Sequence, residues 1–279
     1  MRQMKRPVTY LFVPGNRPER FDKAARAMPD AVILDLEDAV HPDSKPAARE
    51  AVAHWHGATP AGGVRRYLRI NAAATPEFAT DMAWLAALPS PQRCDGVVLP
   101  KAESPQQVAH LARWLEHWQP QAGLVAIIET ARGLAAVEAI AAVPGVTRLA
   151  FGSLDFSLDI GCEEMPEAFL HARSRIVVAS RVAGLPAPVD GVTPDFADID
   201  TVRADAIHAR RLGFGAKLCI HPVQVAPVRD TFMPDAGKLA WAQRVLVAAE
   251  RSHAVQVDGK MVDLPLIEQA QRVLRAAAA

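Results

Sequence analysis

The sequence has no excess of charge of either sign, because 31 Lys and Arg residues balance 31 Asp and Glu residues over 279 positions. Binding of nucleic acid or an anionic membrane through a basic field is therefore not expected. Apolar runs are also short, and none approaches the roughly 20 residues of a membrane-spanning helix. The N-terminal segment has no signal-type apolar stretch before Pro14 and Gly15, so we expect a cytoplasmic protein.

Cysteine is scarce. Cys94, Cys162 and Cys219 are far apart, odd in number and without CxxC spacing. This usage indicates a reducing compartment and argues against both a disulfide framework and a thiolate metal site.

Short runs rich in Val, Ile and Leu recur along the chain, separated by segments of helical spacing. Within a run, apolar residues follow one another without alternating polar residues, which is typical of strands covered on both faces. Eight such runs are present, at 8–15, 31–40, 65–71, 95–103, 124–133, 147–156, 186–195 and 216–225. Helices are expected at 18–28, 44–56, 76–87, 104–118, 131–142, 165–183, 197–212 and 222–232.

Eight strand–helix repeats predict an α/β fold of the (β/α)8 TIM-barrel type. An open doubly wound sheet is the second candidate, but no G-x-G-x-x-G follows the first strand. The rhythm changes after residue 233, where a helix, a hairpin-like turn at Asp258-Gly259 and a last helix follow. We expect a barrel catalytic domain at 1–233 and a C-terminal helical extension at 234–279. The extension is expected to cap an active site, either that of its own chain or that of a neighbouring subunit.

Catalytic groups of such barrels lie at the carboxyl ends of the strands. Carboxylates dominate there, and an arginine lies among them. The polar residues at these ends are Asn16, Asp35, Glu37, Asp38, Arg69, Asn71, Lys101, Glu103, Glu129, Ser153, Asp155, Asp190 and His221.

Glu129 directly follows the apolar run from Leu124 to Ile128, so its carboxylate needs a cationic partner. Asp155 belongs to the next strand and can reach the same ion. Oxygen ligands suit Mg²⁺ or Mn²⁺, which take few carboxylates and leave room for water and substrate. A metal on Glu129 and Asp155 is the first interpretation, and a buried ion pair with Arg69 or Arg132 is the alternative.

Arg69 can bind a carboxylate or an enolate oxygen through two N–H groups. A structural salt bridge to Glu37 or Asp38 is the alternative for Arg69. The acids Asp35, Glu37 and Asp38 cannot all bind a metal directly, so some of them are expected to orient Arg69 or metal-bound water, and Asp38 could equally cap a helix. His221 is a candidate acid or base, although a histidine before a proline is often only positional.

The ordered set "LFVPGNRPERFDKAA", "AVILDLEDAVHPDSKPAARE", "RIN", "VVLPKAES", "AIIETARGL", "FGSLDFSLDIG" and "IHPVQV" resembles the citrate lyase beta-subunit-like (HpcH/HpaI aldolase) family. That family includes citryl-CoA, malyl-CoA and citramalyl-CoA lyases. The resemblance runs from about residue 8 to the end of the chain. It implies a (β/α)8 barrel, Mg²⁺ dependence, CoA-thioester substrates and a homotrimer or hexamer.

The resemblance also implies roles for single residues. It makes Glu129 and Asp155 the metal ligands and Arg69 the residue that binds the oxo acid. It assigns Glu37 and Asp38 as supporting groups in substrate binding and Lys23 to CoA. Asp263 in "GKMVDLP" matches an acid/base residue that reaches a neighbour's site. Leu154 stands where many family members have Glu.

These features predict a Mg²⁺-dependent carbon–carbon lyase. Its reaction is the reversible cleavage of a 3-hydroxyacyl-CoA, such as citryl-, malyl- or citramalyl-CoA, into acetyl-CoA and a 2-oxo acid. The alternatives are a metal-dependent aldolase on free 2-oxo acids without CoA, a non-catalytic binding or regulatory subunit, and a thioester hydrolase.

Overall fold

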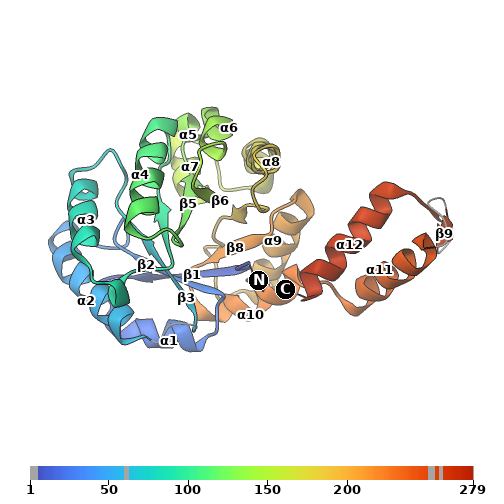
Figure 1. Cartoon of the computed structure of the whole chain (residues 1–279), viewed down its shortest axis with the longest axis horizontal. Helices are drawn as coiled ribbons and strands as arrows, with labels where there is room; N and C mark the ends of the chain where they lie inside the picture. Colours follow the sequence, from blue (N-terminus) through green and yellow to red (C-terminus); the bar gives the residue numbers. More distant parts are fainter. Residues whose placement is uncertain (1–5, 60–62, 251–254, 258–259, 279) are drawn as a thin grey trace. The chain divides into compact units, whose positions relative to one another are not determined.

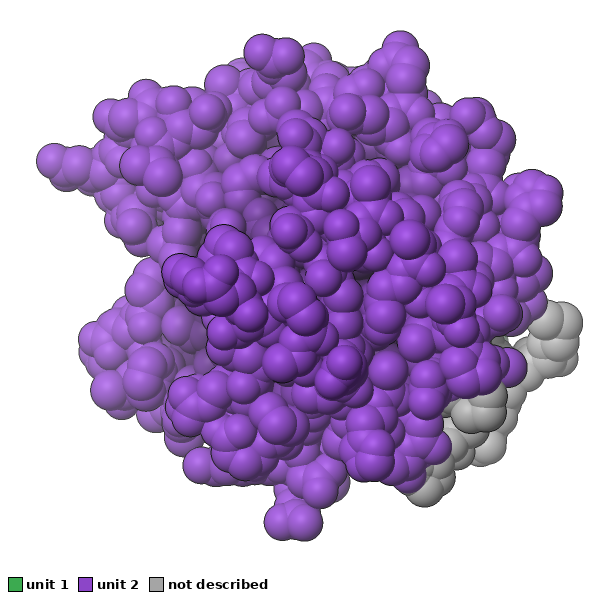
Figure 2. All heavy atoms as spheres, turned by 90° about the vertical axis from the view of Figure 1, so that its left-hand side faces the viewer, with its two compact units in different colours: residues 1–6, 229–279 green, residues 7–228 purple. Residues whose placement is uncertain are grey.

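The computed structural model describes residues 6–59, 63–250, 255–257 and 260–278. They form two compact units, one of residues 7–228 and the other of Arg6 with the residues from Arg229 onward. Figure 1 follows the chain through its elements, and Figure 2 shows one face of the first unit in purple. No helix among the described residues is long and apolar enough to cross a membrane.

The first unit is a closed barrel of eight parallel strands in the order β1 to β8, which confirms the predicted (β/α)8 fold. The strands are β1 (Thr9–Pro14), β2 (Ala31–Asp35), β3 (Arg65–Arg69), β4 (Gly96–Leu99), β5 (Gly123–Ile128), β6 (Val146–Phe151), β7 (Val189–Asp190) and β8 (Ala216–Cys219). Each strand is shorter than the apolar run that predicted it, so the end of each run lies beyond the strand, at the carboxyl end of the barrel.

Helices surround these strands (Figure 1). They are α1 (Phe21–Arg26), α2 (Lys45–Ala58), α3 (Pro76–Ala87), α4 (Pro105–Trp118), α5 (Ala131–Ala135), α6 (Val137–Ala141), α7 (Ser153–Ile160), α8 (Pro166–Val182), α9 (Ile199–Leu212) and α10 (Val225–Phe232). Short 3₁₀ turns are η1 (Pro18–Arg20), η2 (Pro42–Ser44), η3 (Ser90–Gln92) and η4 (Pro222–Gln224).

The helix starts follow ordinary capping chemistry. Pro76, Pro105 and Pro166 occupy first turns, where the absent N–H costs nothing. The Ser104 and Thr130 side chains accept hydrogen bonds from the backbone at the starts of α4 and α5.

The structure corrects one predicted helix and one predicted strand. The range 131–142 forms two short helices, because the backbone at Ala136 is not helical. The strand predicted at 147–156 ends at Phe151, and Ser153 begins helix α7 instead. Asp155 therefore lies in the first turn of a helix and not on a strand.

Alternate residues of each strand fill the barrel interior, because successive side chains of a strand point to opposite faces. This interior core consists of Tyr10, Ala31, Ile33, Tyr67, Val98, Val125, Ile127, Ala150, Val189, Ala216 and Leu218. The same alternation decides which residues at the carboxyl ends of the strands point into the mouth of the barrel.

The second unit contains α11 (Ala236–Ala249), the antiparallel strands β9 (Val255–Val257) and β10 (Lys260–Val262), and α12 (Leu264–Ala278). It has a small core of its own, made of Ala242, Val245, Val262, Ile267 and Ala270. The turn predicted at Asp258-Gly259 lies outside the described residues. The expected capping of an active site by this extension stays a prediction.

Candidate active site

A cavity of about 460 Å³ lies at the carboxyl end of the barrel. Charged and apolar side chains line it together. Its lining comprises Phe12, Pro14, Arg20, Asp35, Asp38, Ala39, Arg69, Ile127, Glu129, Gly152, Ser153, Leu154, Asp155, Val192, Leu218 and Ile220. The charged members come from η1, from the ends of β2, β3 and β5, and from the first turn of α7.

Strand alternation brings three of these charged residues together. Asp35, Arg69 and Glu129 each follow an interior core residue by two positions, so each side chain points into the barrel mouth. Asp35 and Arg69 are also direct neighbours in the register of β2 and β3. Strand alternation within the closed barrel therefore places these three side chains at the centre of the site.

Arg69 is held by two carboxylates. Its Nε donates to Asp35 Oδ1 at 2.7 Å and its Nη2 donates to Asp35 Oδ2 at 2.6 Å. Its Nη1 lies 2.8 Å from Glu37 Oε2, and the guanidinium carbon lies 4.8 Å from the centre of the Phe12 ring. The hydrogen bonds to Asp35 use two of the five guanidinium N–H groups, and the contact with Glu37 is an ion pair. Burial by itself would lower the pKa of Arg69, but the carboxylates of Asp35 and Glu37 outweigh it and raise the pKa above its ordinary value.

Lys101 links Glu37 and Asp38. Its Nζ donates to Glu37 Oε1 and, at 3.0 Å, to Asp38 Oδ2. Burial raises the pKa of Glu37 despite its two cationic partners, whereas the Lys101 hydrogen bond holds the pKa of Asp38 low against its partial burial. Both acids are thus paired with cationic side chains of the protein, and their supporting role in substrate binding stays a prediction.

Glu129 is buried and receives one hydrogen bond from a main-chain group, from the N–H of Lys101 to Oε1 at 2.7 Å. Neither arginine considered as its ion-pair partner fills that role, because Arg69 pairs with Asp35 and Arg132 lies 3.7 Å from Glu103. Burial, and then the nearby carboxylate of Asp155, raise the pKa of Glu129 to about 8.

Gly152 gives Glu129 its space. A Cβ atom at this position would lie 2.1 Å from Glu129 Oε2 and 2.6 Å from Glu129 Cβ. Only glycine therefore allows the Glu129 carboxylate to lie beside the start of α7, where Asp155 is found.

The donors fit a hard divalent cation. Among the described residues no group of three or more His, Cys, Asp or Glu side chains could enclose a metal. Mg²⁺ commonly uses only one or two carboxylates, with water and substrate oxygens in the other positions. Glu129 and Asp155 are two carboxylates that line the same cavity.

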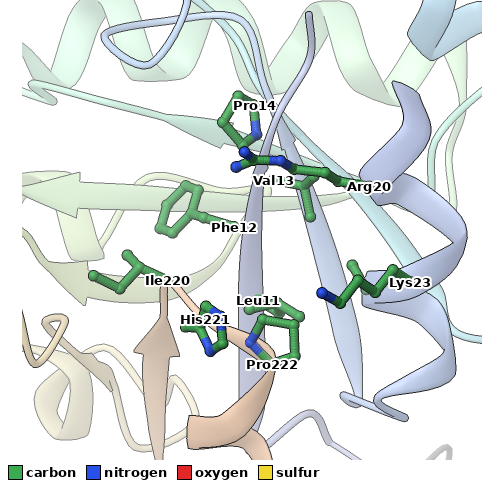
Figure 3. Close-up of a pocket in the computed structure, with 10 residues that line it drawn as sticks. Leu11, Phe12, Val13, Pro14, Arg20, Lys23, Ile220, His221 and Pro222 are labelled. Carbon is green, nitrogen blue, oxygen red and sulfur yellow. The ribbon is translucent and has the colours of Figure 1, made fainter. Parts of the chain in front are cut away.

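A second cavity, of about 350 Å³, lies between β1, α1 and the segment after β8. Lys23 and Arg20 extend into it from the α1 side and His221 from the other (Figure 3). The His221 ring stacks on Phe196 at 4.5 Å, and its Nδ1 accepts from the N–H of Val223, which starts the turn η4. The structure thus gives His221 a positional role at this turn.

Asp263 lies in the second unit, between β10 and α12, and its side chain is exposed. Its Oδ1 is 3.5 Å from the N–H of Leu266, and its carbonyl accepts from Ile267 N–H at 3.1 Å, so it caps α12. The acid/base role of Asp263 stays a prediction.

Two polar residues from the strand ends serve the framework instead. Asp190 follows the interior residue Val189 by one position, so it points outward and pairs with Arg173 at 2.9 Å and Lys217 at 3.3 Å. Asn71 joins another buried network through Asp81.

Sequence reasoning gave no role to Lys101 or Gly152. The only sequence signal for Lys101 was its position after Pro100 at the end of a strand, and for Gly152 its position before the "SLD" segment. Neither pattern reveals that both residues contact Glu129.

The chain matches known proteins over most of its length. Residues 8–222 match the family described as HpcH/HpaI aldolase/citrate lyase. A citrate lyase subunit beta-like protein of Mycobacterium tuberculosis is 38% identical over 276 residues, covering 96% of this chain and 94% of that protein. An L-malyl-CoA/beta-methylmalyl-CoA lyase of Rhodobacter capsulatus is 32% identical over 298 residues, covering 96% of this chain and 93% of that protein.

A solved structure agrees with these matches. The CitE protein of Mycobacterium tuberculosis, in complex with magnesium, acetoacetate and coenzyme A, superposes with a TM-score of 0.82 at 36% identity. The match covers 98% of this chain and 98% of that one. Fold, site and sequence therefore agree that the chain belongs to the HpcH/HpaI aldolase/citrate lyase family.

Proposed function

We propose that the protein is a Mg²⁺-dependent carbon–carbon lyase that acts on a CoA thioester. It reversibly cleaves a 3-hydroxyacyl-CoA, such as citryl-, malyl- or citramalyl-CoA, into acetyl-CoA and a 2-oxo acid. The observation that carries the proposal is the convergence of Glu129, Asp155 and Arg69 on one cavity, in a member of this family.

Glu129 and Asp155 are the residues that would hold Mg²⁺. When bound, the ion polarises the substrate oxygen on the carbon where the bond breaks or forms. Arg69 lines the same cavity and stabilises negative charge that develops on the oxo-acid part. Asp35, Glu37 and the Phe12 ring keep the guanidinium in place, so little reorganisation accompanies the reaction.

Cleavage leaves an enolate of the thioester, which must gain a proton, and condensation must remove one. We assign this proton transfer to Asp263, supplied by a neighbouring subunit of a homotrimer or hexamer. Its exposed side chain, between exposed Met261 and Leu264, supports this assignment. Exclusion of water by the extension would protect the enolate.

Co-expression of two inactive variants tests the shared site. Asp263→Asn keeps the metal ligands and Glu129→Gln keeps the acid/base residue. Equal mixing in a ring of subunits should restore about a quarter of the wild-type sites if each site takes Asp263 from a neighbour. If activity stays absent while a pull-down through a tag on one variant recovers the other variant, the sharing is refuted.

Lys23 and Arg20 in the second cavity would bind the phosphates of CoA, since clustered cations attract phosphate groups. Lys23→Ala should raise KM for the CoA thioester without changing Mg²⁺ affinity. An aldolase on free 2-oxo acids would show no such dependence. We also propose a cytoplasmic location, which fractionation of the source cells would test.

The decisive experiment is a direct assay. The purified protein is incubated with Mg²⁺ and malyl-, citramalyl- and citryl-CoA, and mass spectrometry follows acetyl-CoA and the oxo acid. Glu129→Gln and a chelator should abolish turnover. The matched control is Glu138→Gln, which removes an exposed glutamate paired with Arg175 on the barrel surface and should leave activity unchanged.

The products separate the competing functions. Release of the intact hydroxy acid with free CoA would identify a thioester hydrolase. Cleavage of free 2-oxo-acid aldols without CoA would identify an aldolase. Ligand binding with no turnover of any substrate would identify a binding subunit. Each of these results would refute the lyase proposal.

A further inference from the structure

Lys101 has an unusual backbone conformation at the end of β4. Its φ is +45°, in the left-handed region that residues with a Cβ rarely adopt. Among the described residues, Met28 is the other non-glycine residue with a positive φ. Strained residues of this kind persist where surrounding contacts hold them, and they cluster at functional sites.

This conformation lets the two ends of Lys101 contact different acids. The main-chain N–H donates to Glu129 Oε1 at 2.7 Å. The side-chain Nζ donates to Glu37 and Asp38 and lies 3.5 Å from Asp155 Oδ1. One residue therefore contacts four carboxylates, including both candidate metal ligands.

The contacts of the ammonium group differ in strength. Glu37 and Asp38 accept hydrogen bonds from Nζ, whereas the contact with Asp155 is longer and makes no hydrogen bond among those the structure records. The Asp155 side chain is about one-third exposed (32%) and lines the cavity, so another cation can approach it. A divalent ion on Asp155 would lie close to the ammonium charge and be repelled by it.

We propose that Lys101 is a positioning residue whose ammonium group serves as the counter-ion of Asp155 in the metal-free protein and competes there with the divalent cation. Its main chain fixes Glu129, and its side chain retains Glu37 and Asp38 when the cation occupies Asp155. Lys101 thereby stabilises the metal-free site and weakens metal binding. This inference rests on the proposed metal site at Glu129 and Asp155.

The test measures Mg²⁺ binding by calorimetry and thermal unfolding with and without Mg²⁺. In Lys101→Met the metal-free protein should melt at a lower temperature, because the acids repel one another. Its Kd for Mg²⁺ should be on the order of tenfold lower than that of the wild type. The rise in Tm on adding Mg²⁺ should be correspondingly larger. A purely structural lysine predicts a lower Tm with unchanged or weaker Mg²⁺ binding, and that result would overturn the proposal.

Three further variants separate charge from backbone. Lys101→Gly suits the left-handed conformation, removes the ammonium and should bind Mg²⁺ as tightly as Lys101→Met. It also provides the measurement if Lys101→Met does not fold. Lys101→Arg keeps a cation and should not tighten binding. Arg113→Met removes an exposed cation from α4 and should leave the Kd unchanged.

The wild-type titration distinguishes the two levels of failure. Wild-type protein that binds no Mg²⁺ would refute the metal site itself, and this inference with it. If the wild type binds Mg²⁺ at least as tightly as Lys101→Met and Lys101→Gly do, only the proposed competition is refuted.

Discussion

The buried carboxyl of Glu129 predicts that Mg²⁺ binding depends strongly on pH. Burial, and then Asp155 and Glu37, raise its pKa to about 8, so near neutral pH the group holds a proton. A carboxyl group must lose that proton before it coordinates a metal. Raising the pH from 6 to 8 should therefore strengthen Mg²⁺ binding, with little further change above about pH 8.5.

The magnitude follows from the pKa. At pH 7, about nine-tenths of the Glu129 side chains are protonated, so each Mg²⁺ that binds should release about 0.9 proton. Each pH unit below 8 should weaken the apparent affinity about tenfold. Calorimetry at pH 7 in two buffers of different ionisation enthalpy measures the proton release directly.

Glu129→Gln is the control, since its amide has no proton to release. Weak binding by this variant with no proton release would agree with the assignment. Wild-type binding that releases no proton at pH 7, with a Kd constant between pH 6 and 8, would refute it. Glu129 would then be ionised in the metal-free protein.

The same proton also affects stability without metal. Between pH 4.5 and about 8 the folded protein keeps a proton that the unfolded chain has lost, so the free energy of unfolding falls as pH rises. Because one pKa unit corresponds to about 1.4 kcal/mol, the decrease can reach about 5 kcal/mol. Urea titrations with a chelator should show this slope in the wild type and a flatter one in Glu129→Gln.

Three further substitutions test the framework of the site. Gly152→Ala should displace the Glu129 carboxylate, costing about 1–3 kcal/mol of stability and most Mg²⁺ binding, as calorimetry and urea titration would show; unchanged affinity contradicts this. Asp190→Ala removes a carboxylate partner from the buried side chains of Arg173 and Lys217, and should lower the free energy of unfolding by about 3–5 kcal/mol in denaturant titrations. A loss under about 1 kcal/mol would refute the importance of these ion pairs. Arg69→Lys loses the two-pronged contact and should lower kcat/KM on the order of 100-fold with Mg²⁺ affinity kept; equal activity would contradict the role.

Much of the fold could be predicted from local pattern. Apolar runs covered on both faces and regular helical spacing identified eight strand–helix repeats, because each repeat must bury its strand under its own helix. The pattern did not give the strand ends. The run at 147–156 is continuous in hydrophobicity, yet the chain turns at Gly152 into helix α7. Gly152 lies against the Glu129 side chain at this turn, and no local signal encodes that contact.

The sequence by itself determined the barrel, the family, and the presence of acids and one arginine at the strand ends. Only the tertiary structure decided their direction. Val189 is interior, so Asp190 points outward, whereas Ile127 is interior and Glu129 points into the mouth. Which face of a strand is interior depends on barrel closure, which pairs β1 with β8 across the whole unit. The sequence also did not reveal the charge partners, because Lys101 meets Glu37 only when the barrel brings the carboxyl ends of β2 and β4 together.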